Sequence, residues 1–295
     1  MCELKIFTPT YNRAKELVKL KDSLEKQTDQ RFEWLIIDDG SVDETKAVVE
    51  EWIKTSSLNI RYIYQKNGGK HTAFNRALDE VEDYLNVCVD SDDWVTEDMV
   101  ARVLADDERN WNDETIYAYA YANAYGIPSF SVDKFPQGIK TKELSMGFLL
   151  PGVKEIVRVY KPRILKGIRF PVYAEEPFMP ESALLLQVTN LGDILFFSKP
   201  IVLGEYLPNG LSSKFASLIL SSPKAHDYIV SKKMENATYS FRGMFQTYYQ
   251  GEAYNMKLKR PLFKALRFNG YAVLALPFAV LFYLKKYFGI NRSNE

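Results

Sequence analysis

The sequence predicts an α/β fold in which a mixed, mainly parallel sheet is flanked by helices and followed by a helical C-terminal extension. Three observations predict it. Strand-like and helix-like segments alternate through residues 4–89, further strand-like runs follow between residues 116 and 206, and from about Lys214 the pattern is helical. With 295 residues, 46% of them hydrophobic, the chain can fill one large domain with an appendage, or two modest domains.

Apolar residues define each element of the first third. Continuous apolar runs predict buried strands, and apolar residues three or four positions apart predict helices. The predicted elements are a strand over residues 4–8, a helix over 15–26, a strand over 32–37, a helix over 44–53, a strand over 60–64, a helix over 72–84 and a strand ending at 89. Because helices of this length separate the strands, we expect right-handed crossovers and a parallel sheet.

Later strand signals are fewer. Residues 116–124 alternate Ile and Ala with three Tyr, as an extended strand would, and residues 153–160 and 196–206 are further strand-like runs. Near residue 213 the pattern changes from strand-like to helical.

Charge and cysteine content exclude several classes of protein. The 38 basic and 38 acidic residues cancel, which argues against nucleic acid as a partner, since binders of the phosphate backbone carry a basic excess. Only Cys2 and Cys88 are present, so no disulfide framework is expected. The first residues lack the apolar core of a signal peptide. We therefore expect a cytoplasmic, reducing location.

Polar turns follow the first four predicted strands. They are residues 8–13 (TPTYNR), 38–41 (DDGS), 65–71 (QKNGGKH) and 90–93 (DSDD). Each turn alone has an ordinary structural explanation. In a parallel sheet, however, all four lie at the edge where the strands end, which is where such sheets bind ligands. We call this edge the carboxyl edge and expect the binding site there.

Three carboxylates close together mark the fourth turn. Asp90, Asp92 and Asp93 leave a buried strand within one turn, where they repel one another unless a cation compensates them. The chemistry favours a divalent cation that prefers oxygen ligands. The alternative is a turn that caps the next helix, since residues 94–98 could open one.

These motifs resemble those of the family-2 glycosyltransferases, whose GT-A fold is Rossmann-like and binds nucleotide sugars. The resemblance rests on residues 7–13, 35–43, 67–75 and 90–93, in family order and spacing, and covers roughly residues 3–100. It implies a catalytic domain over 1–212, with a nucleotide-sugar-binding half over 1–100 and an acceptor-binding half over 101–212. The extension then covers 213–295.

The resemblance implies roles for the residues of the carboxyl edge. Tyr11 would offer a ring for stacking, and Asp39, or less favourably Asp38, would accept the imide N–H of uracil. Asp92 and Asp93, at the DXD motif of residues 90–92, would share the metal and the ribose between them, with Asp90 in support. The metal, Mn²⁺ or Mg²⁺, would neutralise the donor diphosphate. Lys70 and His71 would add positive potential near the phosphates, with a merely solvated side chain as the alternative for His71. The expected nucleotide-sugar-binding residues are Thr8, Tyr11, Arg13, Asp38, Asp39, Gly69, Lys70, Asn75, Asp90, Ser91 and Asp92.

Inverting relatives use an acidic base, typically the Asp of a Glu-Asp pair, which this chain lacks in the corresponding region. Residues 173–186 instead read YAEEPFMPESALLL. We expect Glu181 to be the base, because Pro180 is suited to starting a helix and Leu184 follows at the family's spacing. Glu176 is the second candidate. The structural alternative for Glu181 is a favourable charge at a helix N-terminus.

The expected reaction is transfer of one sugar from a nucleoside-diphosphate sugar, most often a UDP-sugar, to a glycan or lipid-linked acceptor of a surface polysaccharide. No Gln/Arg-x-x-Arg-Trp motif of processive synthases is present. Residues 209–213 resemble a loop that in relatives approaches the diphosphate or the acceptor. The alternatives are a sugar-phosphate nucleotidyltransferase and a non-catalytic sugar-nucleotide-binding protein.

The tail contains an apolar run over residues 271–284 with a central Pro277 and basic residues on both sides. Its length suits an interfacial or buried helix better than a membrane span. We expect it to dock on an anionic membrane at the inner face of the cell membrane. Packing onto the catalytic core is the alternative.

Overall fold

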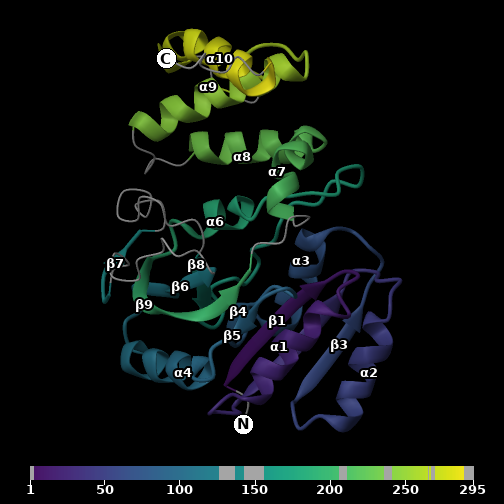
Figure 1. Ribbon diagram of the computed structural model, residues 1–295. Coiled ribbons are helices and arrows are strands. Elements are labelled where there is room, and N and C mark those ends of the chain that lie inside the picture. Colours follow the sequence, from purple (N-terminus) through teal and green to yellow (C-terminus); the bar gives the residue numbers. More distant parts are fainter. Residues whose placement is uncertain are drawn as a thin grey trace, which may run out of the picture. The chain divides into compact units, whose positions relative to one another are not determined.

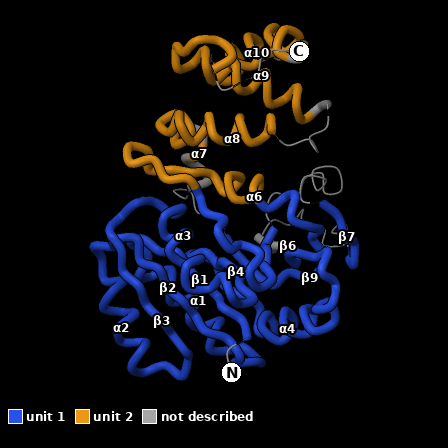
Figure 2. Tube along the Cα trace, turned by 180° about the vertical axis from the view of Figure 1, so that it is seen from behind, with its two compact units in different colours: residues 1–170, 188–210 blue, residues 171–187, 211–295 orange. Residues whose placement is uncertain are grey.

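A computed structural model of the chain describes residues 3–125, 137–142, 156–205, 211–235, 241–264, 266 and 270–288. The chain forms two compact units (Figure 2). Unit 1 comprises residues 1–170 and 188–210, and unit 2 comprises residues 171–187 and 211–295. This division differs from the predicted domains chiefly in residues 171–187, which belong with the helical C-terminal part.

Unit 1 is built on one mixed sheet, with the strand order β3-β2-β1-β4-β8-β6-β9-β5 and β7 paired with β9 (Figure 1). Its described strands are β1 (Leu4–Thr10), β2 (Phe32–Asp38), β3 (Ile60–Tyr64), β4 (Leu85–Cys88), β5 (Trp94–Val95), β6 (Ile116–Tyr125), β7 (Lys140–Thr141), β8 (Ile156–Tyr160) and β9 (Asp193–Gly204). Strands β1 to β4 pair in parallel, as does β6 with β9, whereas β8 runs antiparallel to both of its neighbours. The predicted mixed α/β sheet is confirmed.

Helices cover both faces of the parallel half of the sheet. The described helices of unit 1 are α1 (Glu16–Glu25), α2 (Thr45–Thr55), α3 (Lys70–Val81) and α4 (Met99–Asn110). Leu20 of α1 and Val49 of α2 share one core cluster with Ile6 of β1. On the opposite face, Phe74 of α3 meets Phe7 edge-on, with ring centroids 4.8 Å apart. Successive residues of a strand point to opposite faces, so β1 is buried along its whole length.

The predicted elements of the first third are confirmed to within a few residues. Helix α3 begins at Lys70, two residues earlier than predicted, because Gly69 turns the chain with a φ of 94°. Residues 94–95 form β5, which pairs with β9, so the helix that residues 94–98 could have opened begins only at Met99. Residues 153–155, 206 and 209–210 lie outside the described residues, and 211–213 belong to helix α7.

The described secondary structure of unit 2 is helical, and residues 171–181 are irregular. Its helices are α6 (Ser182–Val188), α7 (Leu211–Leu220), α8 (Pro223–Glu235), α9 (Phe241–Lys257) and α10 (Gly270–Phe288). A small core joins Val230 of α8, Tyr248 of α9 and two alanines of α10, Ala272 and Ala275. Among the described residues, no helix is long and apolar enough to cross a membrane.

Candidate functional site at the carboxyl edge

All four predicted turns leave parallel strands at the carboxyl edge of unit 1, and the first two are tied together. The backbone N–H of Asn12 donates to Ser41 Oγ at 2.8 Å, and Asn12 Oδ1 accepts from the N–H of Val42 at 2.8 Å. Asn12 has a φ of 52°, a conformation that Asn tolerates better than most residues. Sequence reasoning missed Asn12 as the residue that joins the two turns.

The first turn presents an exposed ring and a cation. Tyr11 is 49% exposed, as a stacking residue must be. Arg13 pairs with Glu16 at 3.1 Å. Thr8 is fully buried and its Oγ1 accepts from Trp34 Nε1 at 3.0 Å, so it supports the strand. Thr10, which the sequence did not single out, is buried at the end of β1, and its hydroxyl has no partner among the described residues.

The second turn contains two buried aspartates. Asp38 accepts from the N–H of Ser41 at 2.7 Å and from the hydroxyl of Tyr62 at 2.6 Å. Burial and the Asp38 carboxylate both raise the pKa of Tyr62, so the phenol keeps its proton and remains a donor. Both oxygens of Asp38 are thus used, one by Ser41 of the same turn and the other by Tyr62 of β3.

Asp39 fixes the third turn. Its Oδ1 accepts from the N–H of Gly68 at 3.0 Å and from Gln65 Nε2 at 2.7 Å, and its Oδ2 accepts from the N–H of Gly69 at 2.8 Å. These bonds hold the start of α3 against the end of β2. Gly40 makes room for this contact: a side chain there would meet the backbone nitrogen of Asn67 at 2.7 Å.

Helix α3 brings a lysine to the aspartate cluster. Lys70, its first residue, places Nζ 2.8 Å from Asp90 Oδ2. His71 is 4% exposed, and burial lowers its pKa, so it is neutral at neutral pH and adds no positive potential. The positive charge of this helix start is therefore that of Lys70.

The fourth turn concentrates negative charge. Burial, and then the charge of Asp90, raise the pKa of Asp92, while Arg13 and Lys70 act in the opposite direction. Arg13 from the first turn and Lys70 from the third are therefore electrostatic neighbours of Asp92. Ser91 and Asp93 are buried beside it. Charges from three of the four turns thus act on this carboxylate.

The aspartate cluster fits a divalent cation that a ligand completes. Within the described residues, no group of three or more His, Cys, Asp or Glu side chains could hold a metal ion. The oxygen donors of Asp92 and Asp93 suit a hard cation, and the repulsion between Asp90 and Asp92 would be relieved by one. The remaining ligands would come from phosphate oxygens and water.

Asn75 does not join this cluster by its contacts. Its Nδ2 donates to the carbonyl of Phe170 at 2.9 Å, and its Oδ1 accepts from the N–H of the same residue at 2.8 Å. The amide therefore pins α3 to a segment 95 residues away in the sequence.

The two candidates for the base belong to unit 2. Glu181 is exposed and directly precedes α6, which begins at Ser182. Glu176 is 6% exposed, and its carboxylate accepts from the N–H groups of Lys224 at 2.7 Å and Ala225 at 2.9 Å. Glu176 thus caps the first turn of α8.

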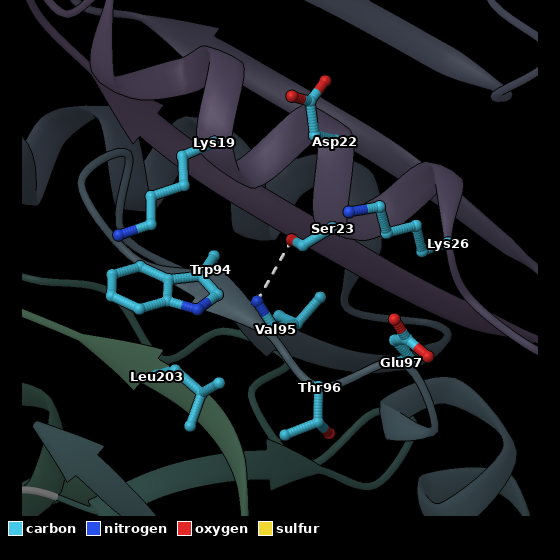
Figure 3. A pocket seen from close by; sticks show the side chains of 9 residues that line it. All are labelled: Lys19, Asp22, Ser23, Lys26, Trp94, Val95, Thr96, Glu97 and Leu203. Carbon is cyan, nitrogen blue, oxygen red and sulfur yellow. Dashed lines mark hydrogen bonds between the residues drawn. The ribbon is translucent and has the colours of Figure 1, made fainter.

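A pocket of about 470 Å³ lies elsewhere on unit 1, between α1 and the segment after the aspartate cluster (Figure 3). Lys19 Nζ lies 3.1 Å from the ring centroid of Trp94, and the N–H of Val95 donates to Ser23 Oγ at 3.1 Å. None of the predicted site residues lines it. The lining residues are Lys19, Asp22, Ser23, Lys26, Trp94, Val95, Thr96, Glu97 and Leu203.

Comparison with known sequences identifies relatives of part of the chain. A family model described as "Glycosyl transferase family 2" matches residues 5–168. Poly(ribitol-phosphate) beta-N-acetylglucosaminyltransferase TarS of Staphylococcus aureus is 28% identical over 130 residues, which are 43% of this chain and 23% of TarS. Glycosyltransferase GlyG of Streptococcus pneumoniae is 27% identical over 169 residues, 52% of this chain and 56% of GlyG. The matched region spans only part of each relative.

Two solved structures share the fold. That of S. aureus TarS 1-349 in complex with UDP has a TM-score of 0.62 at 20% identity, covering 93% of this chain and 81% of that one. Mannosyltransferase PcManGT from Pyrobaculum calidifontis in complex with GDP-Man and Mn²⁺ has a TM-score of 0.56 at 16% identity, covering 98% and 81%. At these identities the likeness establishes the fold alone, and the expected GT-A architecture is confirmed.

Proposed function

Because this chain belongs to glycosyl transferase family 2, we propose that it transfers a single sugar from a nucleoside-diphosphate sugar to a glycan or lipid-linked acceptor. The observation that carries this proposal is the ion pair between Lys70 of the third turn and Asp90 of the fourth, 2.8 Å apart, which joins a basic group to the aspartate cluster at the carboxyl edge. Such a site combines carboxylates for a cation with basic groups that attract a diphosphate.

We propose a UDP-sugar as the donor, with the uracil near the first two turns. The exposed ring of Tyr11 supports stacking of the base. Asp39 accepts hydrogen bonds from two backbone N–H groups, which hold its carboxylate in place. The imide N–H of uracil would donate a further hydrogen bond to this carboxylate. The solved structures of TarS in complex with UDP and with UDP-GlcNAc support this donor class.

Asp92 and Asp93 are the proposed cation ligands, with Asp90 held by Lys70 beside them. A bound Mn²⁺ or Mg²⁺ supplies Lewis-acid stabilisation of the leaving diphosphate. Lys70 adds a fixed positive charge close to the same position, and Arg13 adds a second one from the first turn. PcManGT, whose structure contains Mn²⁺, supports a divalent cation in this fold.

Glu181 is the proposed base that removes the proton from the acceptor hydroxyl. The displacement inverts the configuration at the anomeric carbon. Its exposure leaves the carboxylate accessible to an acceptor. Glu176, in contrast, is buried, and each of its carboxylate oxygens accepts a backbone N–H at the start of α8.

The proposed setting is surface polysaccharide synthesis on the cytoplasmic side of a membrane. The names of relatives support the first part: TarS acts on poly(ribitol-phosphate), and another match is the teichoic acid poly(glycerol phosphate) polymerase of Staphylococcus epidermidis, 36% identical over 94 residues. A lipid-linked acceptor would place the reaction at the membrane surface.

A donor screen tests the proposal. Purified protein is incubated with individual UDP-, GDP-, CDP- and dTDP-sugars and Mn²⁺, and release of the nucleoside diphosphate is measured. We expect slow hydrolysis of one UDP-sugar. Release of pyrophosphate from a sugar phosphate and a nucleoside triphosphate would indicate a nucleotidyltransferase, and binding of a UDP-sugar without turnover in the presence of candidate acceptors would indicate a non-catalytic binder.

A further inference from the structure

Helix α10 exposes its large apolar side chains and buries its small ones. Ala272, Ala275 and Ala279 are fully buried, and α10 packs against α9 (Figure 1). The exposed side chains include valine, leucine and phenylalanine, each between 43% and 66% exposed: Val273, Leu274, Phe278, Val280 and Leu281. A helix that only completed a protein core would have the opposite arrangement.

The exposed side chains form one stripe. At about 100° per residue, the five positions and Pro277 fall within an arc of roughly 160°, and the three alanines lie on the opposite side of the helix. Phe278 also touches Phe245 of α9, with centroids 5.1 Å apart, which fixes the helix in this orientation. The stripe is therefore a feature of the packed helix. We call it the α10 stripe.

Charge identifies what covers the stripe. The whole chain is neutral, yet residues 257–288 contain seven Lys and Arg residues and no Asp or Glu. Lys285 and Lys286 are exposed at the end of α10, and Lys259 and Lys264 are exposed in the segment that precedes it. A second copy of the chain would bring these like charges together, whereas an anionic surface would neutralise them.

We propose that the α10 stripe docks this protein on an anionic lipid bilayer, with α10 lying in the interface plane. Apolar side chains enter the boundary between head groups and acyl chains, while the lysines contact anionic head groups. Pro277 is compatible with this position, since water and lipid head groups can satisfy the carbonyl that it leaves without a donor. Attachment to the membrane is thus assigned to the five exposed apolar side chains of the α10 stripe.

Vesicle flotation of the full chain tests the docking without any sugar donor, so its failure leaves the proposed transfer intact. We expect flotation with vesicles of phosphatidylcholine and phosphatidylglycerol, and much less with phosphatidylcholine alone. The variant L274S/F278S/L281S should lose flotation. The matched control V172S/L191S changes exposed apolar side chains outside the stripe and should float like the wild type.

A charge variant keeps the test decisive if the stripe variant misfolds. K285Q/K286Q should weaken binding to anionic vesicles about fivefold per lysine, whereas K46Q/K54Q on α2 should not weaken it. Equal binding of both lysine variants, or no flotation of the wild type, would overturn the proposal. So would a wild-type dimer that the stripe variant converts to a monomer without any change in flotation, because the stripe would then be an interface between copies.

Discussion

The environment of Asp92 explains how single residues act at this site. Its carboxylate is partly buried beside Asp90, and both effects raise its pKa. The protein thus holds negative charge where it is unfavourable in the absence of a ligand. Arg13 and Lys70 compensate it only in part. The carboxylates gather at the carboxyl edge because the parallel strands end there. Their proposed function is to bind the ligand.

Replacing Asp92 with Asn should abolish sugar transfer without lowering stability. The amide keeps the size of the side chain but removes the charge that holds the cation and the repulsion with Asp90. Transfer rates and thermal melting of the two proteins measure both effects. Asn75→Ala is a useful contrast, because it should lower stability through the lost bonds to Phe170. Normal transfer by Asp92→Asn would refute the assignment.

Replacing Glu181 with Gln should preserve donor binding and lower turnover by on the order of a hundredfold or more, because the amide cannot accept a proton. Titration with UDP and steady-state rates separate the two effects. The matched control is Glu176→Gln, which should retain normal turnover. The reverse pattern would give the base role to Glu176.

At the scale of elements, one side chain caps a helix that is distant in the sequence. Helix α8 begins with Pro223, which has no N–H, and the next two N–H groups are bound by Glu176. The neighbouring Ser222 is buried and its hydroxyl has no partner among the described residues, so it does not act as the cap. The capping bonds therefore join residues 171–187 to α8 within unit 2.

Replacing Glu176 with Ala should lower the free energy of unfolding of unit 2 by about 1–2 kcal/mol. Loss of a cap usually costs this much, and here two N–H groups lose their partner. Urea unfolding followed by circular dichroism measures the change. The exposed Glu175, whose contact is an ion pair with Lys224, provides the control: Glu175→Ala should change stability by less than about 0.5 kcal/mol. Equal effects of the two substitutions would contradict the capping role.

A second buried carboxylate predicts a dependence of stability on pH. Glu252 of α9 is fully buried and accepts from the N–H of Phe263 at 2.7 Å, and burial raises its pKa. A raised pKa in the folded state means that the folded protein binds the proton more tightly. The stabilisation is complete below the ordinary pKa of Glu, about 4.3, and is lost as the pH rises through the raised value.

The variant Glu252→Gln should lack this dependence. Melting temperatures of wild type and variant at about pH 5 and about pH 7 should show that the wild type loses stability relative to the variant as the pH rises. A constant difference between the two proteins would show that Glu252 titrates as it does in the unfolded chain.

At the scale of the whole molecule, activity should depend on a divalent cation while folding should not. The proposed ligands are few, and no described cluster could hold a metal with protein side chains alone. Chelation should therefore stop transfer without changing the circular dichroism spectrum, and added Mn²⁺ or Mg²⁺ should restore the rate. Full turnover after exhaustive chelation would contradict the proposed role of the aspartate cluster.

The sequence by itself determined the alternation of strands and helices through residue 89, and with it the carboxyl edge where the four turns gather. These features depend on the hydrophobic period within each segment and on the general rule that crossovers are right-handed. Neither requires knowledge of contacts between distant segments. The same periodicity could not assign contacts between segments distant in the sequence. Asn75 with Phe170 and Glu176 with α8 are of this kind.

Only the tertiary structure decided which groups are occupied by internal bonds and which face of α10 is buried. The apolar run of residues 271–284 suggested an interfacial helix, but the burial of its alanines against α9 selects the side that faces outward. Likewise, burial makes His71 neutral, although its place beside Lys70 suggested a positive charge. In both cases the deciding quantity is solvent exposure, which depends on what the rest of the chain packs against each residue.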